Sequence, residues 1–180
     1  MSRILLGASA SVALYKACDL ASTLAQAGHE VRTALTPAAA RLVSPQLFEA
    51  VTGAPARVDE FGPERQGAMD HIEWARWTEL FVVAPCTADL AARLALGIAD
   101  DFLTTLALAL RPEVPRLLCP AMNPTMLAAP PVARNLGRLR EDGWRVVEPD
   151  EGHMACGEEG RGRLAEPAHI ARVVAEALGA

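Results

Sequence analysis

The sequence predicts an α/β fold in which a parallel sheet has helices on both faces, and three observations predict it. Short apolar runs of strand length alternate with longer segments of helical spacing along the 180 residues. The run LFVVA at 80–84 is continuously apolar, as expected of a parallel strand that is buried on both faces. Small or polar residues follow the runs, and strands that alternate with helices form right-handed βαβ units.

Each expected element has its own signal. Apolar runs predict strands at 3–7, 30–35, 80–84, 116–119 and 145–147. Helical spacing predicts helices at 12–27, 44–51, 87–96, 102–110, 131–142 and 167–178. Gly28, Gly97 and Gly143 stand where three of these helices should stop. We expect 52–69 to be a loop with one edge strand near Val58, and 151–163 to be a flexible glycine-rich loop.

Composition restricts the class of protein. Residues 1–180 have the length of a single domain, and 51% of them are hydrophobic, which is far from a disordered composition. The formal net charge of −5 gives no electrostatic footprint for nucleic acid. Charges or prolines interrupt every apolar stretch before the roughly 20 residues that a membrane helix needs. The apolar run at 3–7 is too short for a signal peptide, so we expect a cytoplasmic protein.

Four cysteines stand at positions 18, 86, 119 and 156, and none belongs to a CxxC pair. In a reducing cytoplasm we expect free thiols, with Cys86 and Cys119 buried at the ends of apolar runs. Cys156 differs, because it lies among glycines and charged residues. The spacing of the Cys and His residues predicts no metal site.

Folds of this kind bind ligands beyond the carboxyl ends of their strands, so the residues that follow each strand are the candidates. The first strand leads into Ser9, Ala10 and Ser11 and then a helix, which suits a phosphate. Ordinary N-capping by Ser9 or Ser11 explains the same residues. The second strand leads into Thr36 and Pro37, and Thr as N-cap with Pro as first helical residue is a sufficient explanation.

Two further residues carry candidate chemistry. Asn123 stands between prolines after the strand at 116–119, where its amide can bind a carboxylate. Capping of a turn before Pro124 explains Asn123 at least as well. His71 is a candidate general base near neutral pH, although a lone His beside aromatic residues is more often a packed residue.

Five segments, in order along the chain, resemble the flavin-dependent cysteine decarboxylases. They are GASASVALYK at 7–16, HIEWARW at 71–77, APCTADLAARLALGIADDFLTT at 84–105, PAMNPTM at 120–126 and ACGEEGRGRLAEP at 155–167. The PAMN and ACG segments are the specific ones, because they separate these decarboxylases from flavin prenyltransferases of similar fold. The resemblance covers nearly the whole chain and implies a three-layer, flavodoxin-like or Rossmann-like fold that binds FMN.

The resemblance also implies roles for particular residues. His71 and Cys156 are the expected catalytic residues, and Asn123 is the expected contact to the substrate carboxylate. The expected FMN contacts are Ser9, Ala10, Ser11, Thr36, Pro37, Ala38, Thr87, Ala88, Asp89, Leu90 and Ala121. Arg161 and Arg163 are candidate contacts to a substrate phosphate, with surface solvation as the simpler explanation. Family members form homotrimers, or a dodecamer built of trimers, with active sites between subunits.

The implied reaction is FMN-dependent decarboxylation of 4′-phospho-N-pantothenoylcysteine to 4′-phosphopantetheine in coenzyme A biosynthesis. Loss of CO₂ leaves an electron pair on the α-carbon of cysteine, and no neighbouring group can accept it. Oxidation of the thiol to a thioaldehyde provides a C=S group that accepts the pair. Loss of CO₂ then gives an enethiolate, which is reduced. Many bacterial relatives carry a fused synthetase that makes this substrate. We expect the synthetase to be a separate protein here, or the sequence to be trimmed.

Two other activities stay open. A peptidyl-cysteine decarboxylase of a modified-peptide pathway shares the flavin, His and Asn and releases the enethiol unreduced, but such enzymes commonly lack the ACG loop. A non-enzymatic, flavin-binding regulator of phosphatases would keep the fold without catalysis. Three positions also depart from the family pattern: Asp89 and Asp101 replace a frequent Asn, and Leu127 a frequent Trp. Asp89 would place an unexpected carboxylate near the flavin or its phosphate.

Overall fold

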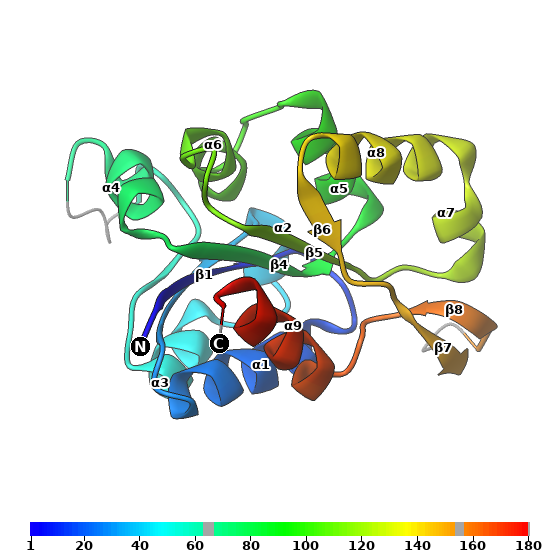
Figure 1. The fold of residues 1–180 in the computed structure, drawn as a ribbon, viewed down its shortest axis with the longest axis horizontal. Helices are drawn as coiled ribbons and strands as arrows, with labels where there is room; N and C mark the ends of the chain where they lie inside the picture. Colours follow the sequence, from blue (N-terminus) through cyan, green and yellow to red (C-terminus); the bar gives the residue numbers. More distant parts are fainter. Residues whose placement is uncertain (63–66, 154–156, 180) are drawn as a thin grey trace.

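The computed structural model describes residues 1–62, 67–153 and 157–179, and its centre is a six-stranded parallel sheet (Figure 1). The strands are β1 (Arg3–Ala8), β2 (Glu30–Leu35), β3 (Ala56–Arg57), β4 (Leu80–Cys86), β5 (Arg116–Pro120) and β6 (Trp144–Val146). Outside this sheet, β7 (Asp150–His153) and β8 (Glu159–Arg163) pair in antiparallel fashion. We call this pair the β7–β8 ribbon.

The order of the strands places a topological switch point between β1 and β4. From β1 the chain moves outward through β2 to β3, then returns to β4 and continues through β5 to β6 on the other side. The full order β3-β2-β1-β4-β5-β6 is the Rossmann order, and without the two-residue β3 it is the flavodoxin order. The predicted fold class is therefore confirmed, and the switch point is where such sheets bind ligands.

Helices cover both faces of the sheet (Figure 1). On one face lie α1 (Leu14–Gln26), α3 (Pro45–Thr52) and α9 (Pro167–Ala177). On the other face lie α4 (Asp70–Trp77), α5 (Ala88–Leu96), α6 (Phe102–Ala109) and α8 (Pro130–Glu141). The short helices α2 (Pro37–Ala40) and α7 (Pro124–Ala128) follow β2 and β5. Within the described ranges, no helix has the length and apolar character needed to cross a membrane.

The strands direct alternate side chains into two apolar layers. Leu6 of β1 belongs to the layer under α1 and α9, whereas its neighbour Leu5 packs with Phe81 in the opposite layer. Gly7 lets that second layer close on β1, because a Cβ there would lie 3.1 Å from Phe81 and 3.2 Å from Leu103. Cys86 and Cys119 are buried free thiols, as predicted, and burial raises the pKa of both.

The ends of the predicted elements shift by a few residues, and the edge strand expected near Val58 is β3. The prediction for 151–163 is wrong in its structure, because that segment holds β7 and β8 rather than an irregular loop. Its strands are built on Gly152, Gly160 and Gly162, whose φ angles of +145° to +152° favour glycine. The segment therefore lacks the branched and aromatic residues by which strands are recognised in a sequence.

Two helices were not predicted. α4 lies between the expected loop at 52–69 and the strand at 80–84. Its Trp74 is buried in the apolar layer that also contains residues of α6. α7 is a five-residue helix that begins at Pro124. Both are shorter than the segments for which helical spacing is informative.

Candidate active site

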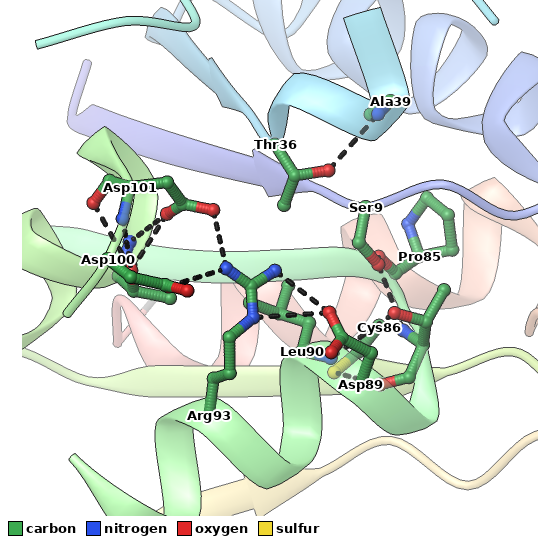
Figure 2. A network of polar contacts seen from close by, with 12 residues as sticks. Ser9, Thr36, Ala39, Pro85, Cys86, Asp89, Leu90, Arg93, Asp100 and Asp101 are labelled. Atoms are coloured by element: carbon green, nitrogen blue, oxygen red, sulfur yellow. Dashed lines mark hydrogen bonds and ion pairs between the residues drawn. The ribbon is translucent and has the colours of Figure 1, made fainter. Parts of the chain in front are cut away.

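The hydroxyl of Ser9 joins β1 to β4 at the switch point. Its Oγ donates a hydrogen bond to the carbonyl of Pro85 at 2.8 Å and accepts one from the N–H of Thr87 at 2.9 Å (Figure 2). Ser9 is only 2% exposed, so both bonds are shielded from water. The side chain of Ser9 therefore holds two strand ends together. Of the two serines that could cap α1, it is Ser11 whose Oγ accepts a hydrogen bond there, from the N–H of Ala13 at 3.2 Å.

Backbone hydrogen bonds bring two more strand ends to the same edge of the sheet. The N–H of Thr36 donates to the carbonyl of Ala8 at 3.0 Å, and the N–H of Ala121 donates to the carbonyl of Cys86 at 2.9 Å. The residues that follow β1, β2, β4 and β5 consequently share one edge. This edge gathers the predicted FMN contacts at 9–11, 36–38, 87–90 and 121.

Thr36 and Thr87 cap the helices that begin at this edge. Thr36 Oγ1 accepts from the N–H of Ala39 at 3.1 Å, and Thr87 Oγ1 accepts from the N–H of Leu90 at 3.3 Å (Figure 2). For Thr36, the capping explanation is confirmed. Most of the exposed or half-buried residues at the edge are small, namely Ala10, Ser11, Pro37, Ala38 and Ala88, whereas Asp89 is exposed and charged. The small residues let a ligand approach the backbone closely.

Arg93 binds the unexpected carboxylates near this edge. Its Nε donates to Asp89 at 3.1 Å, and its Nη1 donates to Asp100 at 2.9 Å and to Asp101 at 2.7 Å (Figure 2). Partial burial alone would lower the pKa of Arg93, but the hydrogen bonds that it donates to Asp100 and Asp101 raise it. The hydrogen bond from Arg93 in turn lowers the pKa of Asp100. The two departures from the family pattern, Asp89 and Asp101, therefore share one guanidinium.

Asn123 lies between β5 and α7, and the helix that follows fixes its orientation. Its Oδ1 accepts from the N–H of Met126 at 2.8 Å, so Asn123 is the N-cap of α7. The capping explanation is confirmed, and it leaves the Nδ2 amino group as the donor for a ligand. Asn123 also lines a cavity of about 280 Å³, together with the start of α1, the end of β5 and the β7–β8 ribbon.

The β7–β8 ribbon packs directly on the segment that follows β5. The N–H of Met122 donates to the carbonyl of Gly162 at 3.0 Å. A Cβ on Gly162 would lie 2.1 Å from the carbonyl oxygen of Met122, and one on Gly160 would lie 3.0 Å from Pro124 Cγ. Only glycine permits this approach at position 162. Cys156, the second predicted catalytic residue, lies outside the described residues, between the end of β7 and the start of β8.

His71 lies on α4, at the opposite end of the molecule from α7 and β8 (Figure 1). A buried ion pair fixes the start of α4 against β3, with 3.4 Å between Asp70 Oδ2 and Arg57 Nη2. Glu60 Oε1 lies 2.5 Å from His71 Nδ1, a contact that is not aligned as a hydrogen bond. One chain therefore does not bring His71 into the cavity of Asn123.

Sequence reasoning missed several residues that line the cavity of Asn123 or contact His71. Lys16, His153 and Gly162 line the cavity of Asn123, and Glu60 contacts His71. A signal existed for Gly162, because glycines at 160 and 162 alternate with arginines at the period of a strand. Nothing in the sequence relates Glu60 to His71.

The two candidate arginines of the ribbon differ in their surroundings. Arg161 pairs with Glu148 at 2.6 Å, and both side chains are about half exposed, so the surface explanation suffices. Arg163 lines the cavity of Asn123. In the ranges that the structure describes, no group of three or more His, Cys, Asp or Glu residues is arranged to hold a metal ion.

Comparison with known proteins shows the family. The Flavoprotein family model matches residues 1–179, and the chain belongs to this family. The chain is 44% identical over 170 residues to the coenzyme A biosynthesis bifunctional protein CoaBC of Bacillus subtilis (strain 168), covering 94% of this chain and 41% of that protein. It is 39% identical over 168 residues to CoaBC of Escherichia coli (strain K12), covering 93% and 41%. The chain thus spans about two-fifths of the length of these relatives.

Solved structures share the fold. A PPC decarboxylase mutant complexed with pantothenoylaminoethenethiol has a TM-score of 0.90 and 29% identity over 99% of both chains. The FMN-dependent cysteine decarboxylase SpaF has a TM-score of 0.82 and 32% identity over 99% of this chain and 98% of its own. The FMN-binding protein AtHal3 has a TM-score of 0.85 and 30% identity over 97% and 95%. The resemblance that the sequence predicted is confirmed.

Replacement of Gly162 by Ala should displace the β7–β8 ribbon, because the new Cβ would overlap the carbonyl oxygen of Met122. We expect the free energy of unfolding to fall by about 1–3 kcal/mol and segment 150–163 to be cut faster by proteases. Urea denaturation and limited proteolysis with mass mapping measure both effects.

The matched control is Gly137→Ala on α8, where an added Cβ meets no atom within 4 Å. This variant should be more stable by about 0.5–1 kcal/mol, because alanine favours a helix interior. If Gly162→Ala were as stable and as protease-resistant as the wild type, the described packing of the ribbon on Met122 would be wrong.

Proposed function

We propose that this chain is an FMN-dependent carboxy-lyase that converts 4′-phospho-N-pantothenoylcysteine to 4′-phosphopantetheine in coenzyme A biosynthesis. The environment of Asn123 carries the proposal: its Oδ1 accepts from α7, its Nδ2 is left to donate, and it lines a cavity together with residues of the β7–β8 ribbon. The identity of 44% to a coenzyme A biosynthesis protein supports this pathway. The likeness to PPC decarboxylase supports this substrate.

The residues at the sheet edge fit a flavin mononucleotide. The positive end of the 13-residue α1 suits a phosphate, and the N–H groups of Ala13 and Leu14 there donate to Ser11. The small residues at 10–11, 37–38 and 88 leave room for a ring against the backbone. When bound, FMN supplies the two-electron oxidation of the substrate thiol and returns the electron pair after CO₂ is lost. Ser9 is buried, and its side chain orders this edge through its two hydrogen bonds.

The chain's own residues orient the substrate and move protons. Asn123 Nδ2 donates to the substrate carboxylate and holds it where the bond to the α-carbon can break. His71 is the acid–base group for oxidation of the thiol. After CO₂ has left, Cys156 gives a proton to the enethiolate carbon.

We propose that a second copy of the chain completes the site, as in a homotrimer. α4, which carries His71, and α7, which Asn123 caps, lie at opposite ends of the molecule (Figure 1), so a neighbouring copy would supply one of the two residues. Exposed apolar residues surround both: Val12 (76% exposed) and Tyr15 (63%) beside the Asn123 cavity, and Met69 (62%) beside His71. A contact between copies would remove this apolar surface from water.

Turnover of the free phosphorylated substrate tests the proposed function. The purified protein should release CO₂ from 4′-phospho-N-pantothenoylcysteine, and mass analysis should show saturated 4′-phosphopantetheine as the product. A peptide ending in cysteine serves as the competing substrate. Preference for that peptide, with an unreduced enethiol as product, would favour the peptidyl-cysteine decarboxylase. No turnover of either substrate by the FMN-loaded protein would favour a regulatory protein.

Variants of His71 and Asn123 should fail at different points. His71→Asn should still bind FMN but should not bleach the flavin when substrate is added, because the acid–base group is missing. Asn123→Asp should not bind substrate productively, because its carboxylate would repel the substrate carboxylate. Flavin absorbance and a substrate-binding titration separate the two defects. Near-normal turnover by either variant would disprove the role assigned to that residue.

Replacement of Cys156 by Ser should stop the reaction after loss of CO₂. A free thiol has a pKa of about 8.5, whereas an alcohol is a far weaker acid and cannot supply the last proton. Mass analysis should then show the enethiol, which has two hydrogens fewer than 4′-phosphopantetheine. Normal product at a normal rate would rule out Cys156 as the proton donor.

A further inference from the structure

Lys16 has no part in the reaction described above, yet its place is unusual. The sequence contains 17 Lys and Arg residues, and position 16 is the only lysine. Lys16 lies in the first turn of α1 and lines the same cavity as Asn123. Only 10% of its side chain is exposed. A buried ammonium group is costly unless its N–H groups find acceptors, so the partners of Lys16 decide its role.

Glu166 satisfies one of the three N–H groups of Lys16. The distance from Lys16 Nζ to Glu166 Oε1 is 2.7 Å, and this hydrogen bond lowers the pKa of Glu166. Glu166 is the one acceptor for Nζ among the residues that the structure describes. Arg163 Nη2 reaches the same oxygen atom at 3.4 Å. Two cations thus share one oxygen, and both keep N–H groups for another anion.

The other acidic residue in this cluster is already engaged. Asp150 Oδ2 accepts from the N–H of Glu166 at 3.1 Å, and Asp150 lies opposite Arg163 in the β7–β8 ribbon. The cavity wall therefore presents N–H donors from Lys16, Arg163 and Asn123 Nδ2. Donors of this kind recognise an anion.

Two more features of the cavity define the ligand. The start of α1 borders the cavity at Ala13 and places the positive end of the helix there, while the N–H groups of Ala13 and Leu14 already donate to Ser11. Val12, Met122 and Leu164 form an apolar wall. The cavity therefore suits a molecule with an anionic group at one end and an apolar body.

We propose that Lys16, together with Arg163, binds the phosphate group of a phosphate monoester, while Glu166 holds the ammonium in place. The source of the phosphate rests on the proposed function, because both the phosphorylated substrate and FMN carry a phosphate monoester. Each also has a body that the apolar wall can contact. The chemistry is the same for both, and experiment separates the two sources.

The test compares each ligand with the same molecule lacking phosphate. Lys16→Met should raise the KM for 4′-phospho-N-pantothenoylcysteine about tenfold to a hundredfold and leave the KM for N-pantothenoylcysteine unchanged, if the substrate phosphate binds there. If the phosphate of FMN binds there, the Kd for FMN should rise by that factor and the Kd for riboflavin should not. Equal effects on the phosphorylated and unphosphorylated forms of both pairs would overturn the proposal.

Glu166→Gln is the matched control, because it breaks the same ion pair from the other side. It frees the ammonium group, so the preference for the phosphorylated ligand should persist or increase. A purely structural ion pair predicts the opposite pattern, in which both variants lower Tm equally and neither changes the preference for phosphate.

A measurement on the unaltered protein covers the case in which Lys16→Met fails to fold. Because Lys16 is the only lysine, acetylation by acetic anhydride can be followed at this one side chain by mass spectrometry. Inorganic phosphate should slow acetylation of Lys16 and not that of the α-amino group. Absence of this protection would contradict the proposal, even if the decarboxylase activity were established. If only the decarboxylase assay failed, the comparison of FMN with riboflavin and this protection experiment would still test whether Lys16 binds phosphate.

Discussion

The hydroxyl of Ser9 makes its two hydrogen bonds across the point where the sheet reverses its strand order, and the placement of the site depends on them. β1 and β4 run parallel there, and their ends are also joined by the ladder between Ile4–Gly7 and Leu80–Val83 and by the hydrogen bond from the N–H of Ser9 to the carbonyl of Pro85 at 3.1 Å. A net contribution of about 1 kcal/mol for each bond is small, but an unpaired buried hydroxyl would cost more. By holding both ends, Ser9 lets the turns after β1 and β4 form one surface.

The remainder of the site is arranged around this edge by close backbone packing and by shared charges. Gly162 lets the β7–β8 ribbon lie on Met122, which places the ribbon over the cavity of Asn123. Arg93 donates hydrogen bonds to Asp89 and Asp101, the two carboxylates at positions where the sequence resemblance leads us to expect amides. The same principle holds at the cavity, where Glu166 serves both Lys16 and Arg163. Lys16 and Asp101 are thus paired with charges on other elements, whereas Asp89 and Arg93 pair within α5.

Features that depend on residues close together in the sequence could be predicted, whereas features that depend on distant residues could not. The strand at 80–84 and the cap at Thr36 were predictable, because apolar continuity and capping are encoded within a few residues. The cap made by Asn123 was recognised as an alternative for the same reason. The pairing of Lys16 with Glu166 was not predictable, since 150 residues separate them in the sequence. The β7–β8 ribbon was missed because its strands are made of glycines and charged residues, which lack the usual apolar alternation.

If the edge beside Ser9 holds FMN next to a bound cysteine carboxylate, the visible spectrum of the purified protein should show it. The protein should be yellow as purified or after addition of FMN, and denaturation should release FMN rather than FAD. Addition of 4′-phospho-N-pantothenoylcysteine should bleach the flavin band transiently and leave it restored when product has formed. A colourless protein that does not take up FMN would contradict the account.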